Sequence, residues 1–263
     1  MDIHTRFTQM NYTGSKYRRL QAIFPACARA QSWMAIFFVV SLCVDSPAGA
    51  ETREEVVPEF DAFFKMDDRT RLFLKGAATR GEDADLSRGS DQYKSNEAAV
   101  SLDFTLQPIL RARLADEDWE HNRYFWMRVG YHYLGKFYDS EKAENRGSVE
   151  LDTRQPVSDN FWFTGRLKWD LRDIAGENAK RYGVRLGVER PFSAGGRALV
   201  PYAHAEVLYD TRYDTWNQQI YQTGIDIGLN NRWRVEPYFQ YQENTQSEPA
   251  HVYAIGLIIK YYH

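Results

Sequence analysis

The chain has 263 residues, a formal net charge of −3 and a mean hydropathy of −0.58. This polar composition excludes a helical membrane protein with several spans, because each span needs roughly 20 consecutive apolar residues. Five of the 33 basic and two of the 36 acidic side chains fall in the first fifty residues, so the remainder carries a net charge of −6 and nucleic acid is not an expected partner.

Near the N-terminus, residues 33–44 form an apolar run (WMAIFFVVSLCV) that follows several basic residues. The run is too short for a membrane-spanning helix and is typical of the core of a signal peptide. Ala48 and Ala50 then supply the small-x-small pattern at which signal peptidase cuts. We therefore expect residues 1–50 to be a removed signal peptide and residues 51–263 to be one exported domain. An uncleaved membrane anchor is the alternative.

After the signal peptide, segments of about ten residues alternate between apolar and polar positions. This period of two predicts β-strands with one apolar and one polar face, whereas helical spacing would mix the two sets. In chain order, the eleven segments are 59–66, 71–78, 99–107, 123–135, 148–155, 163–172, 181–189, 199–210, 221–229, 233–242 and 253–263.

These segments predict an all-β fold, a transmembrane antiparallel up-and-down β-barrel. Single-chain bacterial barrels nearly always have an even number of strands, so we expect about 12 strands, with 10 as the alternative. A twelfth strand would lie near residues 56–74 or within residues 108–122. Longer outer loops are expected in the polar stretches 81–96, 136–147, 173–180, 211–217 and 244–250.

A soluble β-barrel would also show alternation, so the position of the charges decides between the two. In residues 181–189, Val184 and Leu186 share one face, while Arg181 and Arg185 occupy the other. The aromatic content of 15% and the export signal favour lipid outside and a charged lumen inside. We therefore expect a Gram-negative bacterial outer-membrane protein, with outer-membrane lipid and the barrel-assembly machinery as partners. A soluble periplasmic β-barrel binding protein is an alternative.

The final segment, 253–263 (YAIGLIIKYYH), resembles the C-terminal assembly signal of outer-membrane barrels at Gly256, Ile259 and Tyr261. Much of the remaining chain resembles an uncharacterised bacterial outer-membrane β-barrel family, DUF2490. The resemblance implies the barrel fold and the outer-membrane location, and it assigns no catalytic residue. It is carried by GYHY at 130–133, RYGVRLGVE at 181–189, PYAHAE at 201–206 and EPY at 236–238.

Charged side chains recur on the polar faces of the predicted strands, where they would line the lumen. Because an unpaired buried charge is costly, we expect ion pairs between opposite walls, with a conducting or solute-binding lumen as the alternative. For Tyr202 and Tyr238 we expect packing, with stacking on a sugar as the alternative. The basic candidates are Arg166, Lys168, Arg172, Arg181 and Arg185; the acidic candidates are Glu189, Glu206, Asp226 and Glu236; His132 and His204 are also expected to face inward.

A histidine acts as a general base in acyl transfer only when a serine and an orienting carboxylate lie within hydrogen-bond distance. The sequence shows no such serine near His132 or His204. Glycine-rich phosphate loops and spaced metal-ligand clusters are also absent from the sequence. We therefore expect no enzyme activity, cofactor or metal. The expected role is non-enzymatic, as a small porin-like pore or envelope-structure protein that admits a small hydrophilic solute. An outer-membrane lipid-modifying hydrolase, and calcium binding by the acidic stretch 81–85, are the alternatives. Cys27 and Cys43 both lie in the expected signal peptide.

Overall fold

The computed structural model describes residues 52–83, 92–106, 125–136, 143–158, 161–247 and 249–263. All of them fall within one compact unit, Ser46–His263. The regular elements in these ranges are β-strands, and none of the residues described forms a helix long and apolar enough to cross a membrane. The expected signal peptide lies outside the described residues, so its removal stays a prediction.

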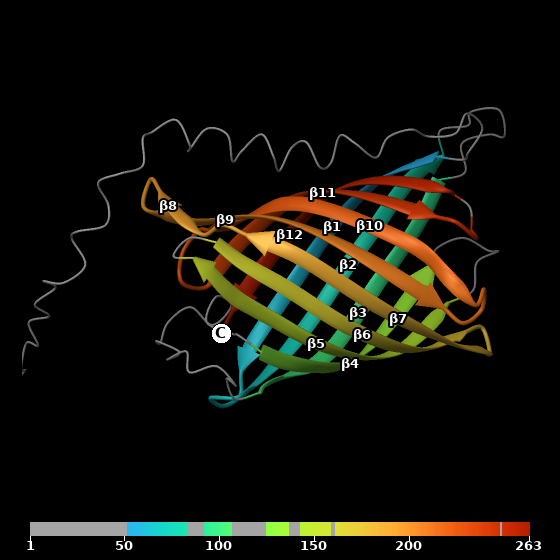
Figure 1. Cartoon of the computed structure of the whole chain (residues 1–263), viewed down its shortest axis with the longest axis horizontal. Coiled ribbons are helices and arrows are strands. Elements are labelled where there is room, and N and C mark those ends of the chain that lie inside the picture. Colours follow the sequence, from blue (N-terminus) through green and yellow to red (C-terminus); the bar gives the residue numbers. More distant parts are fainter. Residues whose placement is uncertain (1–51, 84–91, 107–124, 137–142, 159–160, 248) are drawn as a thin grey trace, which may run out of the picture. The chain divides into compact units, whose positions relative to one another are not determined.

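The strands follow one another around a single sheet, and strands adjacent in sequence are paired in space (Figure 1). The pairing order deviates only at β8, which pairs with the start of β9. The described strands are β1 (Thr52–Lys65), β2 (Thr70–Asp83), β3 (Gln92–Thr105), β4 (Phe125–Lys136), β5 (Glu144–Ser158), β6 (Phe161–Ile174), β7 (Glu177–Glu189), β8 (Phe192–Ala194), β9 (Arg197–Asp210), β10 (Thr215–Gly228), β11 (Trp233–Asn244) and β12 (His251–Tyr262).

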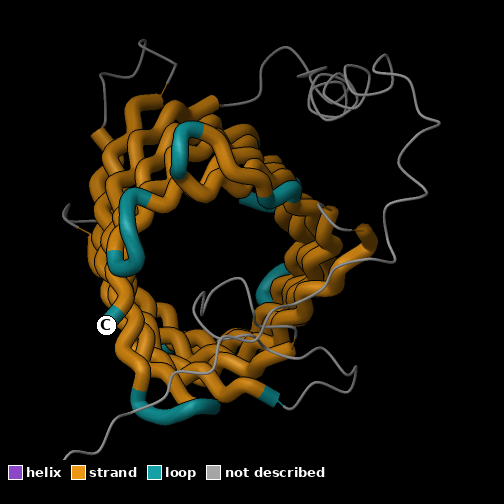
Figure 2. Tube along the Cα trace, turned by 90° about the vertical axis from the view of Figure 1, so that its left-hand side faces the viewer, coloured by secondary structure: helices purple, strands orange, loops and turns teal. Residues whose placement is uncertain are grey.

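The sheet closes into a barrel because β1 pairs with β12 along twelve residue pairs, from Thr52 opposite His251 to Phe63 opposite Tyr262. Viewed along the axis, the strands form a ring (Figure 2). The total of twelve described strands matches the number expected, but eleven of them form the wall, because β8 has three residues and lies beside it. Neighbouring pairs in this part of the chain are antiparallel except for β1 and β12, which run parallel.

The odd number of wall strands differs from the even number that the sequence analysis expected. That expectation assumed that both ends of the wall lie on one side of the membrane. Parallel pairing also satisfies the edge groups of β1 and β12, so closure does not require an even count. As a result, Thr52 at the start of β1 and Tyr262 at the end of β12 lie at opposite ends of the barrel.

Each of the eleven alternating segments overlaps one wall strand, and several strands are longer than expected. The stretch 173–180, expected as a long loop, is instead the ends of β6 and β7 joined by a two-residue turn. Ala175 and Gly176 have φ values of 52° and 89°, as the tightest hairpin turns require. Of the two stretches considered for a further strand, 56–74 is occupied by β1 and β2, and 108–122 lies outside the described residues.

The turn between β1 and β2 is held by a side chain. The backbone N–H groups of Arg69 and Thr70 donate to Asp67 Oδ1 at 2.7 and 2.8 Å. These two hydrogen bonds lower the pKa of the Asp67 carboxyl below its ordinary value, because they favour its charged form. The turn thereby fixes the register with which β2 returns along β1.

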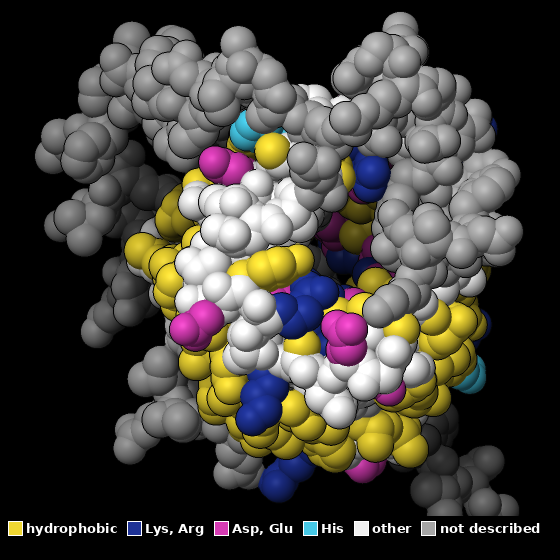
Figure 3. All heavy atoms as spheres, turned by 90° about the vertical axis from the view of Figure 1, so that its right-hand side faces the viewer, with side chains coloured by type: hydrophobic (Ala, Val, Ile, Leu, Met, Phe, Trp, Pro, Cys, Tyr) yellow, Lys and Arg dark blue, Asp and Glu magenta, His cyan; other side chains and the backbone are white. Residues whose placement is uncertain are grey.

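The outward and inward faces of the wall differ in chemistry. Apolar side chains cover the outside, and the end at which β1 begins is hollowed, with charged side chains in the opening (Figure 3). Leu167, in the middle of β6, is 56% exposed on the outside, whereas the neighbouring Arg166 and Lys168 point inward to Asp152 and Glu150 of β5. This is the arrangement of a transmembrane β-barrel, with the apolar face turned to lipid.

Aromatic side chains gather on the outward face near both ends of the barrel. They contact one another between neighbouring strands, with ring centroids 4.8 Å apart for Trp233 and Tyr261 and 5.8 Å apart for Tyr209 and Trp216. Two such girdles at the two membrane interfaces are typical of transmembrane barrels. The first group includes Phe64, Trp233 and Tyr261, and the second includes Tyr182, Tyr209 and Trp216.

Candidate functional site

The inner face of the wall carries the residues that the sequence analysis proposed for the lumen. Their positions alternate with outward apolar residues, and most of them hydrogen-bond or form ion pairs with other inward side chains. His132 comes from β4, Arg166, Lys168 and Arg172 from β6, Arg181, Arg185 and Glu189 from β7, Tyr202, His204 and Glu206 from β9, Asp226 from β10, and Glu236 and Tyr238 from β11.

Ion pairs run along the wall rather than across the lumen, which corrects the expectation of pairs between opposite walls. Arg166 Nε donates to Asp152 Oδ1 of the adjacent strand at 2.6 Å. The farthest-reaching pairs, such as Lys260 Nζ on β12 with Asp226 Oδ2 on β10 at 2.9 Å, join strands two places apart. Inward positions on neighbouring strands are only about 5 Å apart, so each long side chain meets a partner beside it first. Among the ion pairs of the described residues, none crosses the barrel axis.

A buried ionic cluster braces the end of the barrel at which β1 ends. Asp103 on β3 is 0% exposed and accepts hydrogen bonds from Arg71 Nε at 3.0 Å and from Arg128 Nε at 2.6 Å. The two guanidinium groups stack on Phe63 and Phe73, with 4.2 and 3.9 Å from Cζ to the ring centroids. Sequence reasoning did not single out this cluster, because β2 and β3 showed the weaker alternation.

A second cluster lies at the opposite end of the barrel. Arg172 on β6 donates through Nε and Nη2 to Glu144 on β5, both at 2.6 Å, and through Nη1 to Asp210 on β9. Asp210 also accepts a hydrogen bond from Arg212 Nη2 at 2.7 Å, in the turn that follows β9. This side-chain hydrogen bond raises the pKa of Arg212 above its ordinary value. Arg181, one of the predicted lumen residues, belongs to the same cluster, because its Nη2 lies 3.5 Å from Asp210 Oδ2.

Tyr202 and Tyr238 lie flat against the wall, each over a glycine of the neighbouring strand. A Cβ at Gly224 would lie 2.7 Å from Tyr202 Oη, and one at Gly256 would lie 2.0 Å from Tyr238 Cζ. Tyr202 donates to Glu236, accepts a hydrogen bond from Gln222 Nε2 at 2.7 Å, and stacks on His204 with 5.7 Å between ring centroids. Both rings therefore occupy wall space that only a glycine leaves free, which is the packing role considered for them.

We expect Gly256→Ala to lower the free energy of unfolding by about 1–3 kcal/mol, because the new methyl group displaces the Tyr238 ring. The measurement is urea unfolding of the folded barrel in detergent micelles. In a Tyr238→Ala background the same substitution should have little effect, since the obstructing ring is gone. Gly147→Ala on β5 is the matched control, because nothing lies within 4 Å of its Cβ position. Equal losses in Gly256→Ala and Gly147→Ala would contradict the proposed packing.

A cavity of about 220 Å³ inside the barrel brings part of the predicted lumen set together. Its basic side chains are paired with carboxylates, as in Arg185 Nε with Glu206 Oε2 at 2.9 Å and Arg154 Nε with Glu189 Oε2 at 2.7 Å. The cavity wall therefore presents donors and acceptors with little net charge. Of the predicted residues, Arg166, Arg185, Glu189, Tyr202, His204, Asp226 and Glu236 line it, whereas His132, Lys168, Arg172, Arg181, Glu206 and Tyr238 do not.

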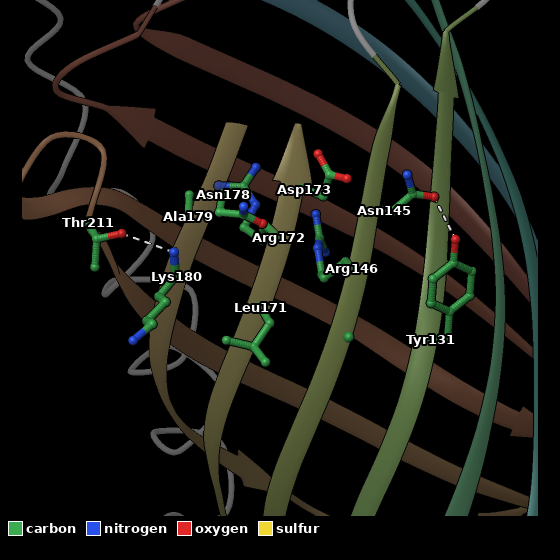
Figure 4. Close-up of a pocket in the computed structure, with 11 residues that line it drawn as sticks. Tyr131, Asn145, Arg146, Leu171, Arg172, Asp173, Asn178, Ala179, Lys180 and Thr211 are labelled. Atoms are coloured by element: carbon green, nitrogen blue, oxygen red, sulfur yellow. Dashed lines mark hydrogen bonds between the residues drawn. The ribbon is translucent and has the colours of Figure 1, made fainter. Parts of the chain in front are cut away.

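A second hollow, of about 550 Å³, lies at the ends of β4 to β7 (Figure 4). Tyr131 Oη donates to Asn145 Oδ1, and the backbone N–H of Lys180 donates to Thr211 Oγ1 at 2.9 Å. Tyr131, Asn145 and Lys180 alternate with inward residues and so belong to the outward face. This hollow therefore lies on the outward face at the rim of the barrel, here called the outer rim, and is not part of the lumen cavity.

His132 engages both of its ring nitrogens, which the sequence analysis did not foresee. Nδ1 lies 2.8 Å from Glu97 Oε1, and Nε2 lies 3.0 Å from Ser148 Oγ. The expectation that no serine lies near His132 is wrong. In the register of β4 and β5, Gly130 is opposite Ser148, so Ser148 is a diagonal neighbour of His132, within reach of a long side chain. His204 has no comparable partner: its Nε2 has no hydrogen bond within the described part of the chain.

Within the residues that the structure describes, no group of three or more His, Cys, Asp or Glu side chains is placed to hold a metal ion. The acidic stretch 81–85, considered for calcium, extends into residues outside the described set. Calcium binding there stays an untested alternative to the expectation of no metal.

No family model matches the chain, and no curated protein matches it. Membership of the DUF2490 family therefore stays a prediction. Among solved structures, the chain is similar to the crystal structure of the β domain of the Bordetella autotransporter BrkA. The two are 12% identical, with a TM-score of 0.41, over 70% of this chain and 80% of that chain. The barrel described above follows from the strand pairing of this chain and does not depend on that likeness.

Proposed function

We propose that the chain is an outer-membrane β-barrel protein of a Gram-negative bacterium whose lumen is a small, charged pore for hydrophilic solutes. The observation that carries the proposal is the division of the wall into an apolar outer face and an ionic inner face whose ion pairs run along the wall. We expect outer-membrane lipid around the apolar outer face and water against the ionic inner face.

The outer face argues against the alternative of a soluble periplasmic binding protein. Large apolar side chains such as Leu167, Leu186 and Ile255 are more than half exposed, and they lie between the two aromatic girdles. In water this continuous band would be far larger than the patches that monomeric soluble proteins expose. Burial in acyl chains removes that cost, which favours the membrane.

The inner face supports passage of small polar solutes rather than a sealed core. The ion pairs satisfy one another on the wall, so the charges do not need to bridge the lumen. The cavity of about 220 Å³ offers both hydrogen-bond donors and acceptors. A lumen of this kind suits neutral, hydroxyl-rich solutes and gives little selection by charge.

Export and insertion follow from the same proposal. Residues 1–50 serve as the cleaved signal peptide, and the barrel-assembly machinery recognises the C-terminal segment, which forms β12. No catalytic step is required for the pore itself. A lipid-modifying hydrolase is less well supported, because the one hydrogen-bonded serine and histidine pair described above faces the lumen and not the lipid.

Planar-bilayer recording tests the pore. The protein without its signal peptide, purified from outer membranes in its folded state, should give stepwise conductance with weak ion selectivity. Arg166→Gln should shift the selectivity toward cations, because Asp152 and Glu150 lose a positive partner. Lys180→Gln is the control and should leave the selectivity unchanged, since Lys180 lies on the outer rim. Folded protein that gives no conductance steps would refute an open lumen.

A further inference from the structure

Three inward residues on adjacent strands form a hydrogen-bonded relay. Glu97 Oε1 on β3 lies 2.8 Å from Nδ1 of His132 on β4, and His132 Nε2 lies 3.0 Å from Oγ of Ser148 on β5. Antiparallel pairing of β3 with β4 and of β4 with β5 brings the three together. We propose that Ser148 is a nucleophile for ester hydrolysis, with His132 as its general base and Glu97 as the positioning residue.

The chemistry of acyl transfer requires this order of groups. A serine hydroxyl is a weak nucleophile until a base accepts its proton, and a carboxylate on the other ring nitrogen fixes the tautomer of that base. Here Glu97 Oε2 also forms an ion pair with Lys75 Nζ at 3.2 Å. The arrangement therefore has a nucleophile, a base and an oriented carboxylate, each within hydrogen-bond distance of the next.

The residues around the proposed nucleophile include a cation, Arg146, and a buried carboxylate, Asp170, which is opposite Ser148 in the register of β5 and β6. Arg146 is opposite His132 in the register of β4 and β5, and it precedes Ser148 by two residues, so both side chains are on the inward face. Its guanidinium is fixed by Glu144, with Nε to Oε1 at 2.8 Å. A fixed cation of this kind stabilises the negative charge that develops on a carbonyl oxygen during attack.

The proposed reaction is balanced without a cofactor. Ser148 Oγ bonds to the carbonyl carbon of the ester while its proton moves to His132 Nε2. The bond from the carbonyl carbon to the alkoxy oxygen then breaks, and the alcohol leaves with the proton from His132. Water, deprotonated by His132, cleaves the acyl-serine and restores the Ser148 hydroxyl. The net change is ester and water to carboxylic acid and alcohol.

The position of the relay restricts the substrate. Ser148 is 2% exposed and its strand position faces the lumen, near the end of the barrel at which β1 begins and whose opening is visible in Figure 3. A long acyl chain would have to leave the lipid and enter a charged lumen, which is unfavourable. The substrate class is therefore a small hydrophilic ester, such as an O-acetylated sugar, that enters from the lumen.

Covalent labelling with a small dialkyl fluorophosphate, on the full chain in detergent micelles, tests the nucleophile. The wild type should be labelled at Ser148, and Ser148→Ala should not be labelled. Ser101→Ala is the matched control and should keep the label. Ser101 is also 2% exposed and lies on the other side of Gly130, but its hydroxyl has no hydrogen-bond partner among the described residues.

Turnover of 4-nitrophenyl acetate tests the base and the positioning residue. His132→Gln should lower kcat at least about 100-fold, and Glu97→Gln should lower kcat with KM unchanged, which a loss of structure would not do. Heat-modifiable migration in gels confirms that each variant is folded. The proposal is overturned if folded wild type shows neither labelling nor turnover above Ser148→Ala, or if Ser101→Ala reduces both equally. Conductance is recorded separately, so this failure would leave the pore proposal standing.

Discussion

Replacing Asp103 by alanine is expected to lower the free energy of unfolding by about 3–5 kcal/mol. The carboxylate is 0% exposed and is shared by Arg71 and Arg128, which stack on Phe63 and Phe73. Its removal leaves two guanidinium groups beside one another with their main anionic partner gone. The cost of an uncompensated buried charge exceeds the value of the ion pair itself, so the effect should be among the largest of any single substitution in the wall.

Urea unfolding of the folded protein in micelles measures this loss, with tryptophan fluorescence as the signal. Asp68→Asn is the matched control, because Asp68 forms an ion pair with Lys65 Nζ at 3.0 Å while its side chain is 95% exposed. An exposed pair contributes little, so the control should stay within about 0.5 kcal/mol of the wild type. If Asp103→Ala matched this control, the cluster would be solvated and would not brace the barrel.

The alternation of the sequence predicts the wall because side-chain direction in a strand is a local property. Each residue points to the face opposite that of its neighbour, whatever strand it pairs with. For that reason the inward positions of Arg166, Arg185 and Glu206 follow from the sequence, and the structure places them there. The strand ends were harder to place, since outward residues beyond the girdles, such as Asn145 and Lys180, are polar and hide the alternation.

Partners between strands do not follow from the sequence, because they depend on register and on the route of closure. Ser148 is sixteen residues from His132 and Glu97 is thirty-five, and only the pairing of β3, β4 and β5 brings them together. Without register, pairs across the lumen were a reasonable expectation for the charges. Once the register of the strands is known, the charged side chains discussed above have nearer partners on strands one or two places away.

The odd-numbered wall illustrates the same limit. The expected even number of strands rests on the assumption that both ends of the wall lie on the same side of the membrane. The hydrogen bonding of the backbone does not require an even number. The backbone edges of β1 and β12 are satisfied by parallel pairing over twelve positions, which the sequence does not encode in its alternation. The turn at Ala175 and Gly176 was missed for a related reason: alanine rarely adopts positive φ, so the sequence carried a weak turn signal there.

Leu167→Arg is the second substitution with a large expected effect, and it tests the membrane directly. Leu167 lies in the middle of β6 and is 56% exposed on the outward face. In a lipid bilayer, an arginine at the midplane of a barrel costs about 2–4 kcal/mol. At an exposed position of a soluble barrel the same change would fall within about 0.5 kcal/mol. The free energy of unfolding from lipid vesicles therefore separates the two environments.

Leu171→Arg supplies the depth control for this experiment. Leu171 lies on the same face of β6 but four residues nearer the end of the strand, where the cost of an arginine falls to about 0–1 kcal/mol. A large effect at Leu167 with a small one at Leu171 identifies a band of lipid around the middle of the wall. Equal, small effects at both positions would mean that the apolar face meets water, and the outer-membrane proposal would then have to be abandoned. Because both variants add the same charge to the same strand, the difference between them depends on depth alone.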